Sequence, residues 1–199
     1  MKTSRIRSSK QLSYKKVYYI VTEGKTTEPS YFKIVEAYIP DDAQIAVVCQ
    51  SASKSSIPSI LEKAKSLAAQ KSHEKDEVWT VLDQDSDSHF AHQFEKLKDW
   101  EKLSPKHHIA VSIPRFEYWL LCHFESSPSK SNAMHDVYVA KYLPGYDRKK
   151  DLERHKGKIT VQSIQHAIRV ASRIPLNSYH SSTPGSDVWK LVQSLLAGE

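Results

Sequence analysis

Short apolar runs alternate with segments of helical spacing through the first 113 residues of this 199-residue chain. Four of the runs are rich in β-branched and aromatic residues and are typical of strands: residues 17–22, 43–49, 78–82 and 108–113. Apolar residues three and four positions apart predict helices between them, over residues 31–38, 60–68 and 90–100. The alternation predicts βαβ units, and therefore an α/β fold with a mostly parallel four-stranded sheet flanked by helices.

The pattern changes after Pro114. The rest of the chain predicts helices and no further strand, over residues 116–124, 137–143, 159–174 and 188–196. The very polar stretch 147–158 is expected to be an exposed loop or a hairpin of helices. We therefore divide the chain into a basic N-terminal arm, an α/β core and a helical C-terminal extension packed on the core: residues 1–15, 16–125 and 126–199.

The net charge of +6 is concentrated at the N-terminus. Residues 1–16 contain six Lys and Arg residues and no acidic residue, so the rest of the chain is neutral overall. A basic arm of this kind can bind the phosphates of a nucleic acid without reading its sequence. It can equally be a solvated leader with no partner, and both interpretations stay open.

Composition and cysteine usage narrow the class of protein further. No apolar run approaches the roughly 20 residues that span a bilayer, and the basic start has no apolar segment typical of a secretion signal. Cys49 and Cys122 are far apart, which predicts neither a disulfide framework nor a paired-cysteine metal motif. We expect a reduced, cytoplasmic protein that does not associate with membranes.

Carboxylates follow two of the predicted strands at the points where they end. Glu23 follows the first strand, and Asp83 and Asp85 follow the third. Residues two apart in an extended segment point the same way, so these aspartates can address one Mg²⁺ or Mn²⁺, and Asp87 joins them if the segment stays extended. The alternative for the aspartates is a turn in which Asp87 caps the next helix. Because parallel strands end at one edge of a sheet, Glu23 favours the metal site.

Two other ligand motifs are excluded by spacing. The tripeptide Gly24-Lys25-Thr26 resembles the end of a phosphate-binding P-loop, but the required earlier glycine is replaced by Tyr19, inside the strand. The aspartate spacing resembles a calcium-binding EF-hand loop, but Ser88 and Phe94 stand where that loop needs glycine and glutamate.

Further charged residues are candidates for the same site. Glu117 lies in an otherwise apolar segment, where an unpaired carboxylate is costly to bury, so it either binds metal or pairs with Arg115 or another cation. Lys25 and Arg115 are candidates to contact a substrate phosphate, or they balance the carboxylates. His123, in the same apolar segment as Glu117, is expected to be a hydrogen-bonded core histidine. The basic residues of 148–158 form either a solvated face or a second phosphate contact.

Three segments together resemble a known family. A strand followed by Glu-Gly and a later strand followed by Asp-x-Asp is the pattern of the Toprim domain of primases, topoisomerases and OLD-type nucleases. The fuller motifs resemble the RloB family, which is related to the AbiLii phage-resistance proteins. They are VTEGKTTEPSYF at 21–32, VLDQD at 81–85 and PRFEYWLLCHF at 114–124, with a weaker match, DVWKLV, at 187–192.

The resemblance implies a Toprim-like nuclease that acts as an effector in bacterial anti-phage defence, beside an AAA- or ABC-type ATPase. It implies that Glu23 is a general acid or base or a metal ligand, and that Asp83 and Asp85 bind Mg²⁺. The chain departs from the family before Phe116, where it has Ile113 in place of the asparagine that many relatives carry. Asp87 is not part of the family pattern.

Three functions follow, with one preferred. We expect a metal-dependent nuclease centred on Glu23, Asp83 and Asp85, with Glu117 as a further candidate catalytic residue. The alternatives are a non-catalytic binding or toxin-like module that works through the ATPase, and a phosphoryl or nucleotidyl transferase that uses the same carboxylates. The choice between DNA and RNA, such as tRNA, stays open, as does homo-oligomerisation.

Overall fold

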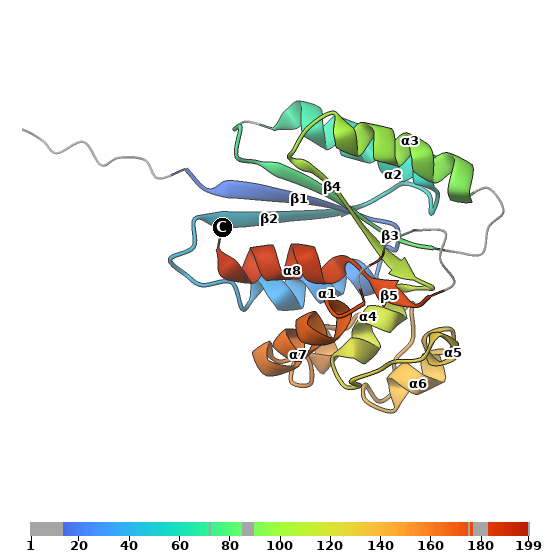
Figure 1. Ribbon diagram of the computed structural model, residues 1–199. Helices are drawn as coiled ribbons and strands as arrows, with labels where there is room; N and C mark the ends of the chain where they lie inside the picture. The colour runs from blue at the N-terminus through green and yellow to red at the C-terminus, as the bar shows by residue number, and fades with distance from the viewer. Residues whose placement is uncertain (1–13, 72, 85–89, 175, 177–182, 199) are drawn as a thin grey trace, which may run out of the picture.

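A central sheet with helices on both faces organises the molecule (Figure 1). The computed structural model describes residues 14–71, 73–84, 90–174, 176 and 183–198. In this part of the chain the sheet has five strands in the order β2-β1-β3-β4-β5. The predicted α/β class with a mostly parallel sheet is confirmed.

Four parallel strands carry the sheet and match the four predicted ones. They are β1 (Lys16–Thr22), β2 (Ile45–Ser51), β3 (Glu77–Asp83) and β4 (His107–Ile113). The central strand β3 is buried along its whole length, as its continuous apolar character predicts. The prediction of four strands missed β5 (Gly185–Ser186), which pairs antiparallel with β4. A two-residue strand has no periodicity that a sequence pattern can register.

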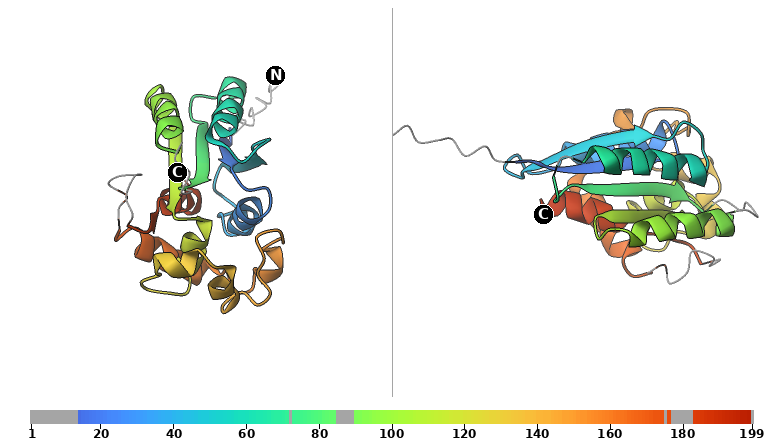
Figure 2. Two further views of the ribbon diagram at one scale, coloured as in Figure 1. Left: turned by 90° about the vertical axis from the view of Figure 1, so that its right-hand side faces the viewer. Right: turned by 90° about the horizontal axis from the view of Figure 1, so that it is seen from above.

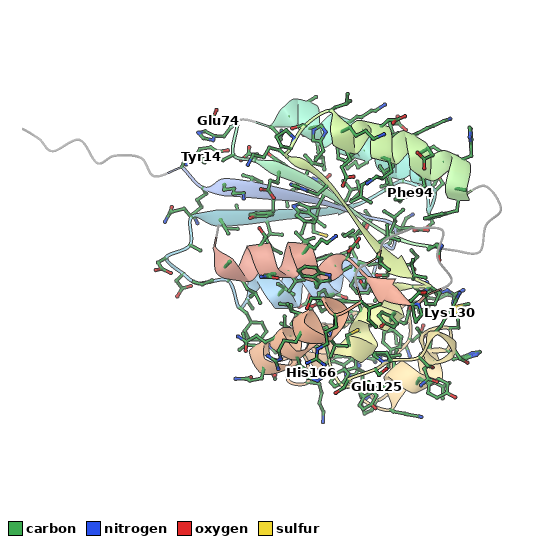
Figure 3. The ribbon with its side chains drawn as sticks, in the orientation of Figure 1. Tyr14, Glu74, Phe94, Glu125, Lys130 and His166 are labelled. Atoms are coloured by element: carbon green, nitrogen blue, oxygen red, sulfur yellow. The ribbon has the colours of Figure 1, made fainter. Side chains whose placement is uncertain are left out.

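The helices that alternate with these strands cover both faces of the sheet. Helices α2 (Ile57–Gln70) and α3 (Phe90–Lys102) lie on one face, and α1 (Thr27–Glu36) and α8 (Val188–Ala197) lie on the other (Figure 2). Two separate apolar clusters result, one between the sheet and α2 and α3, the other beneath α1 and α8. Side chains fill the space on both sides of the sheet (Figure 3).

The second half of the chain forms short helices beneath α1 and α8. They are α4 (Phe116–Cys122), α5 (Lys130–Ala133), α6 (Asp136–Ala140), a 3-10 turn at Glu153–His155 and α7 (Val161–Ala171). The apolar cluster beneath α1 continues through α4 into α7 and α8. Our division at residue 125 therefore stays a prediction, because one apolar cluster spans it.

The polar stretch 147–158 is exposed at most positions, as predicted, but it is anchored to the core. Leu152 and the following Ile159 are fully buried. The backbone N–H of Leu152 donates to the Ser30 hydroxyl on α1 at 3.0 Å, and Lys33 of α1 pairs with Glu153. These contacts hold the stretch beside the start of α1, at the end of the sheet where β1 and β3 finish.

Two further predictions concern the basic N-terminal arm and association with membranes. The basic arm lies outside the described residues except for Tyr14 and Lys15. Among the helices that the structure describes, none has the length and apolar character needed to cross a membrane.

Candidate functional site

A cavity of about 410 Å³ opens at the carboxyl ends of β1 and β3. Ligands in open parallel sheets bind at this edge. Four carboxylates and three cations line it, together with polar and backbone groups: Glu23, Glu28, Asp83, Glu117, Lys25, Arg148, Lys149, Gly24, Thr26, Thr27, Ser55 and Phe116. The structure therefore brings together the predicted residues Glu23, Asp83, Glu117 and Lys25.

A tightly fixed turn places Glu23 at the cavity. The carbonyl of Gly24 accepts hydrogen bonds from the hydroxyls of Thr22, at 2.8 Å, and Ser51, at 2.9 Å. Its backbone N–H donates to Oε1 of Glu28 at 3.0 Å. A Cβ atom at residue 24 would overlap the Glu28 carboxylate, so any other residue here would displace that side chain. Tyr19 lies within β1, as the exclusion of a P-loop assumed.

Asp83 links the end of β3 to the start of α4. Its Oδ1 accepts the backbone N–H of Phe116 at 2.8 Å, while Arg115, which precedes the helix, provides no side-chain cap. Its own backbone N–H donates to Oε2 of Glu23 at 3.2 Å. Asp83 is 8% exposed and Glu23 is half-buried. The Glu23 side chain thus meets the backbone of Asp83 across neighbouring strands, and both residues line the cavity, as the strand-end pattern predicts.

Glu117 is the most deeply buried carboxylate of the cavity, with 1% exposure. Its Oε1 accepts a hydrogen bond from the Tyr146 hydroxyl at 2.7 Å and lies 3.0 Å from Nε of Arg148. Its other oxygen, Oε2, is buried and has no hydrogen-bond partner. The cation that pairs with Glu117 is Arg148, one of the two alternatives that its burial predicts.

Glu28 adds a fourth carboxylate, from the first turn of α1. Burial is the main cause that raises the pKa of its carboxyl group, and the nearby charge of Glu117 adds to it. The backbone N–H of Gly24 and the guanidinium of Arg148 act against this rise. Glu28 thus lies in the first turn of α1 and also lines the cavity.

The cations of the cavity lie nearer to solvent than its carboxylates. Lys25 and Lys149 are exposed, and the Arg148 side chain is 44% exposed. The cavity therefore has an acidic floor, formed by Asp83, Glu28 and Glu117, and a basic rim, formed by Lys25, Arg148 and Lys149. Of the basic residues of 148–158, Arg148 and Lys149 line the cavity, and the choice between a solvated face and a phosphate contact stays open. Arg115 is not among the described residues that line the cavity, so its contact with phosphate stays a prediction.

The donors suit a hard divalent cation. Carboxylate oxygens are the ligands that Mg²⁺ and Mn²⁺ prefer, and Oε2 of Glu117 is a buried oxygen without a partner. Within the described residues, no three His, Cys, Asp or Glu side chains converge closely enough to hold a metal. Asp85 and Asp87, the other predicted ligands, lie outside the described residues.

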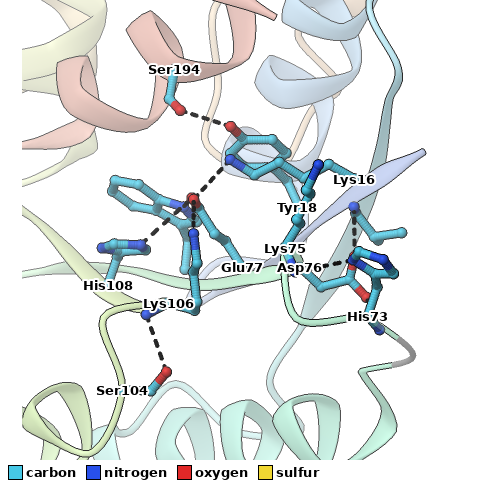
Figure 4. A network of polar contacts seen from close by, with 12 residues as sticks. Lys16, Tyr18, His73, Lys75, Asp76, Glu77, Ser104, Lys106, His108 and Ser194 are labelled. Atoms are coloured by element: carbon cyan, nitrogen blue, oxygen red, sulfur yellow. Dashed lines mark hydrogen bonds and ion pairs between the residues drawn. The ribbon is translucent and has the colours of Figure 1, made fainter. Parts of the chain in front are cut away.

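A second charged cluster lies at the opposite end of the sheet (Figure 4). Glu77, at the start of β3, lies 2.8 Å from Nζ of Lys16 and accepts a hydrogen bond from the Trp79 indole at 3.0 Å. Burial opposes the ionisation of Glu77, but these two bonds prevail and hold its pKa below the usual range. Asp76 is fully buried and accepts the Tyr14 hydroxyl at 2.7 Å. These carboxylates are compensated by fixed partners and have the character of structural groups.

His123 is a core histidine, as predicted. It is buried, and its ring nitrogens lie 3.0 Å from the carbonyl of Trp119 and 3.2 Å from the hydroxyl of Tyr31. Burial lowers its pKa to about 4, so it is neutral near pH 7.

Comparison with known proteins gives one match. The family model described as RloB-like protein matches residues 18–195, which is most of the chain and includes every described residue of the cavity. Searches of curated proteins and of solved structures give no match.

Proposed function

Because the chain belongs to the RloB-like family and carries an acidic floor with a basic rim, we propose that it is a metal-dependent nuclease. The reaction is hydrolysis of a phosphodiester bond in DNA or RNA. The observation that carries this proposal is the meeting of Glu23 and Asp83, from neighbouring strand ends, in a cavity that also holds Glu117 and Arg148. Buried acids beneath exposed bases suit a divalent cation below and a phosphate above.

Each group of the cavity has a distinct task in this proposal. Asp83 and Glu117, with Asp85 from the predicted pattern, would hold Mg²⁺ or Mn²⁺. The bound ion supplies charge to orient the phosphodiester and stabilise its leaving oxygen. Glu23 is half-buried and borders solvent, so its carboxylate can exchange a proton with water or with the leaving group. Lys25 and Lys149 bind the negative phosphate at the rim.

The proposal extends to a partner. Family resemblance suggests an effector of anti-phage defence that works beside an AAA- or ABC-type ATPase. In this scheme the ATPase permits cleavage, and the cavity performs it. A non-catalytic module and a phosphoryl or nucleotidyl transferase are the competing functions, and the experiment below separates them.

The test is cleavage of a panel of DNA and total tRNA with Mg²⁺ or Mn²⁺, with and without the ATPase encoded beside it. Wild type is compared with Glu23→Gln, which removes one charge with little change of shape. Glu95→Gln is the matched control, because Glu95 is an exposed residue of α3 outside the cavity. We expect cleavage by wild type and the control, and a loss of at least about 100-fold with Glu23→Gln.

Three results would contradict this proposal. Equal cleavage by wild type and Glu23→Gln would show that the cavity is not the active site. No cleavage under any condition, together with retained binding of the ATPase, would favour the non-catalytic module. Transfer of a nucleotide or phosphoryl group without cleavage would favour the transferase.

A further inference from the structure

Arg148 directs its guanidinium at two buried carboxylates of the cavity, although its side chain is 44% exposed. Its neighbours Lys149 and Lys150 are exposed. Its guanidinium, in contrast, lies 3.0 Å from Oε1 of Glu117, through Nε, and 3.8 Å from Oδ2 of Asp83, through Nη2. One cation therefore serves two carboxylates that come from different elements, β3 and α4.

The backbone holds Arg148 in this position. Its carbonyl accepts a hydrogen bond from the Thr27 hydroxyl at 3.1 Å, at the start of α1. Two residues earlier, the Tyr146 hydroxyl donates to the same Glu117 oxygen that Arg148 meets. Burial opposes the charge of Arg148, but Glu117 and Asp83 prevail and raise the pKa of its guanidinium. The arginine is thus a permanent charge directed at the acidic floor.

This position coincides with the place proposed for the divalent ion. Asp83 and Glu117 are the described carboxylates nearest to Arg148 and also two of the proposed metal ligands. A guanidinium and a divalent cation bound to the same two carboxylates lie close together and repel each other. Binding one of them must weaken binding of the other.

We propose that Arg148 is a resident counter-cation of the cavity, which competes with the divalent metal for Asp83 and Glu117. The inference rests on the proposed metal site and adds a residue that regulates the affinity of that site for metal. While the metal is absent, Arg148 neutralises carboxylates that would otherwise repel each other. When Arg148 gives up these carboxylates, its half-exposed side chain is free to meet a substrate phosphate at the rim. Arg148 is then a positioning residue with two alternating sets of partners.

A purely structural role makes the opposite prediction. If Arg148 only ties residues 147–158 to α4, its removal loosens Glu117 and leaves metal affinity unchanged or weaker. Competition requires that removal of the guanidinium strengthens metal binding. The direction of the change in affinity therefore separates the two roles.

The experiment is a titration of the full-length protein with Mn²⁺, after bound metal has been removed by chelation. Binding is measured by calorimetry and by the spin-resonance signal of free Mn²⁺. The variants are Arg148→Gln and Arg148→Lys, with Lys149→Gln as the matched control from the same rim. We expect Arg148→Gln to bind Mn²⁺ about tenfold more tightly, the scale of one lost charge-assisted contact. Arg148→Lys should lie nearer to wild type, and Lys149→Gln should change affinity less than about threefold.

The outcomes also separate this inference from the proposed function. Mn²⁺ binding by wild type with equal or weaker binding by Arg148→Gln overturns the competition and leaves the metal site intact. No binding by wild type or by any variant overturns the metal site and the competition together. A melting curve of each variant in chelator verifies that it is folded. A larger rise of the melting temperature with Mn²⁺ for Arg148→Gln than for wild type supports the competition by a second readout.

Discussion

The single residue Glu28 connects burial, charge and the acidic floor of the cavity. It is 6% exposed, lies near Glu117, and has a raised pKa caused mainly by burial. A carboxyl group with a raised folded-state pKa resists ionisation in the fold but ionises freely in the unfolded chain. Its contribution to stability is therefore complete below the ordinary pKa of about 4.3 and is lost as the pH rises through the folded-state pKa.

The substitution Glu28→Gln should remove this loss of stability at neutral pH. The amide oxygen can still accept the N–H of Gly24, while the charge beside Glu117 is gone. We expect the variant to be more stable than wild type at pH 7 to 8, with the difference vanishing as the pH falls to about 4. Urea unfolding across this range in chelator measures it. A variant that is less stable than wild type at pH 8 would contradict the assigned direction of the pKa shift.

For individual side chains of the cavity, the sequence predicts the acids better than the cations that pair with them. Glu23 and Asp83 follow from the rule that parallel strands end at one edge, and Glu117 from the cost of burying a charge in an apolar helix. Arg148 belongs to a run of basic residues, and nothing local in the run distinguishes the one that turns inward. That choice depends on the contacts of the stretch with α1 and α4.

The first turn of helix α4 is capped by a carboxylate from the strand β3. Arg115 precedes the helix and provides no side-chain cap, and Oδ1 of Asp83 accepts the N–H of Phe116 instead. Asp83 is therefore both a predicted metal ligand and the cap of the helix that carries Glu117. Loss of activity in an alanine variant would mix these two roles.

Two substitutions at Asp83 should separate them. Asp83→Asn keeps an oxygen that can cap α4, whereas Asp83→Ala removes it. We expect Asp83→Ala to lower the free energy of unfolding by about 1 to 2 kcal/mol, the usual loss of a helix cap. Asp83→Asn should lose less stability but bind Mn²⁺ as weakly as Asp83→Ala. Denaturant unfolding and Mn²⁺ titration measure the two effects, and equal stability of both variants would contradict the capping role.

Most elements that the sequence predicts are long enough to show a period, and the exception is the five-residue helix α6, which overlaps the predicted helix 137–143. The four parallel strands and the helices α1, α2, α3, α7 and α8 each have at least 7 residues. The strand β5, with 2 residues, and the helix α5, with 4, were not predicted. Both depend on neighbouring elements: β5 pairs with β4, and α5 packs against α4.

The two ends of the sheet differ in how their buried carboxylates are compensated. At the amino ends of the strands, Glu77 and Asp76 have fixed partners that compensate them. At the carboxyl ends, the acidic floor holds Asp83, Glu28 and Glu117, with one inward cation. A stable fold can support an incompletely compensated site at one end because the other end and the two apolar clusters hold the sheet together.

The N-terminal arm provides a test of nucleic-acid binding that does not depend on catalysis. Residues 1–13 carry four basic residues and no acidic one, namely Lys2, Arg5, Arg7 and Lys10. If each of these four residues neutralises one phosphate, a protein truncated to remove residues 1–13 should bind nucleic acid more weakly. The slope of log affinity against log salt for duplex DNA should then be shallower by up to about 3.6.

Fluorescence anisotropy with duplex DNA and with tRNA, between about 50 and 200 mM salt, measures this slope. A full-length variant with the four basic residues replaced by glutamine is the matched control, because it removes charge and keeps length. Equal effects of truncation and replacement would assign the binding to charge, whereas an unchanged slope in both would identify the arm as a solvated leader. In that case the basic rim is the next surface to test, and Lys149→Gln should reduce the slope by about 1 if Lys149 binds a phosphate.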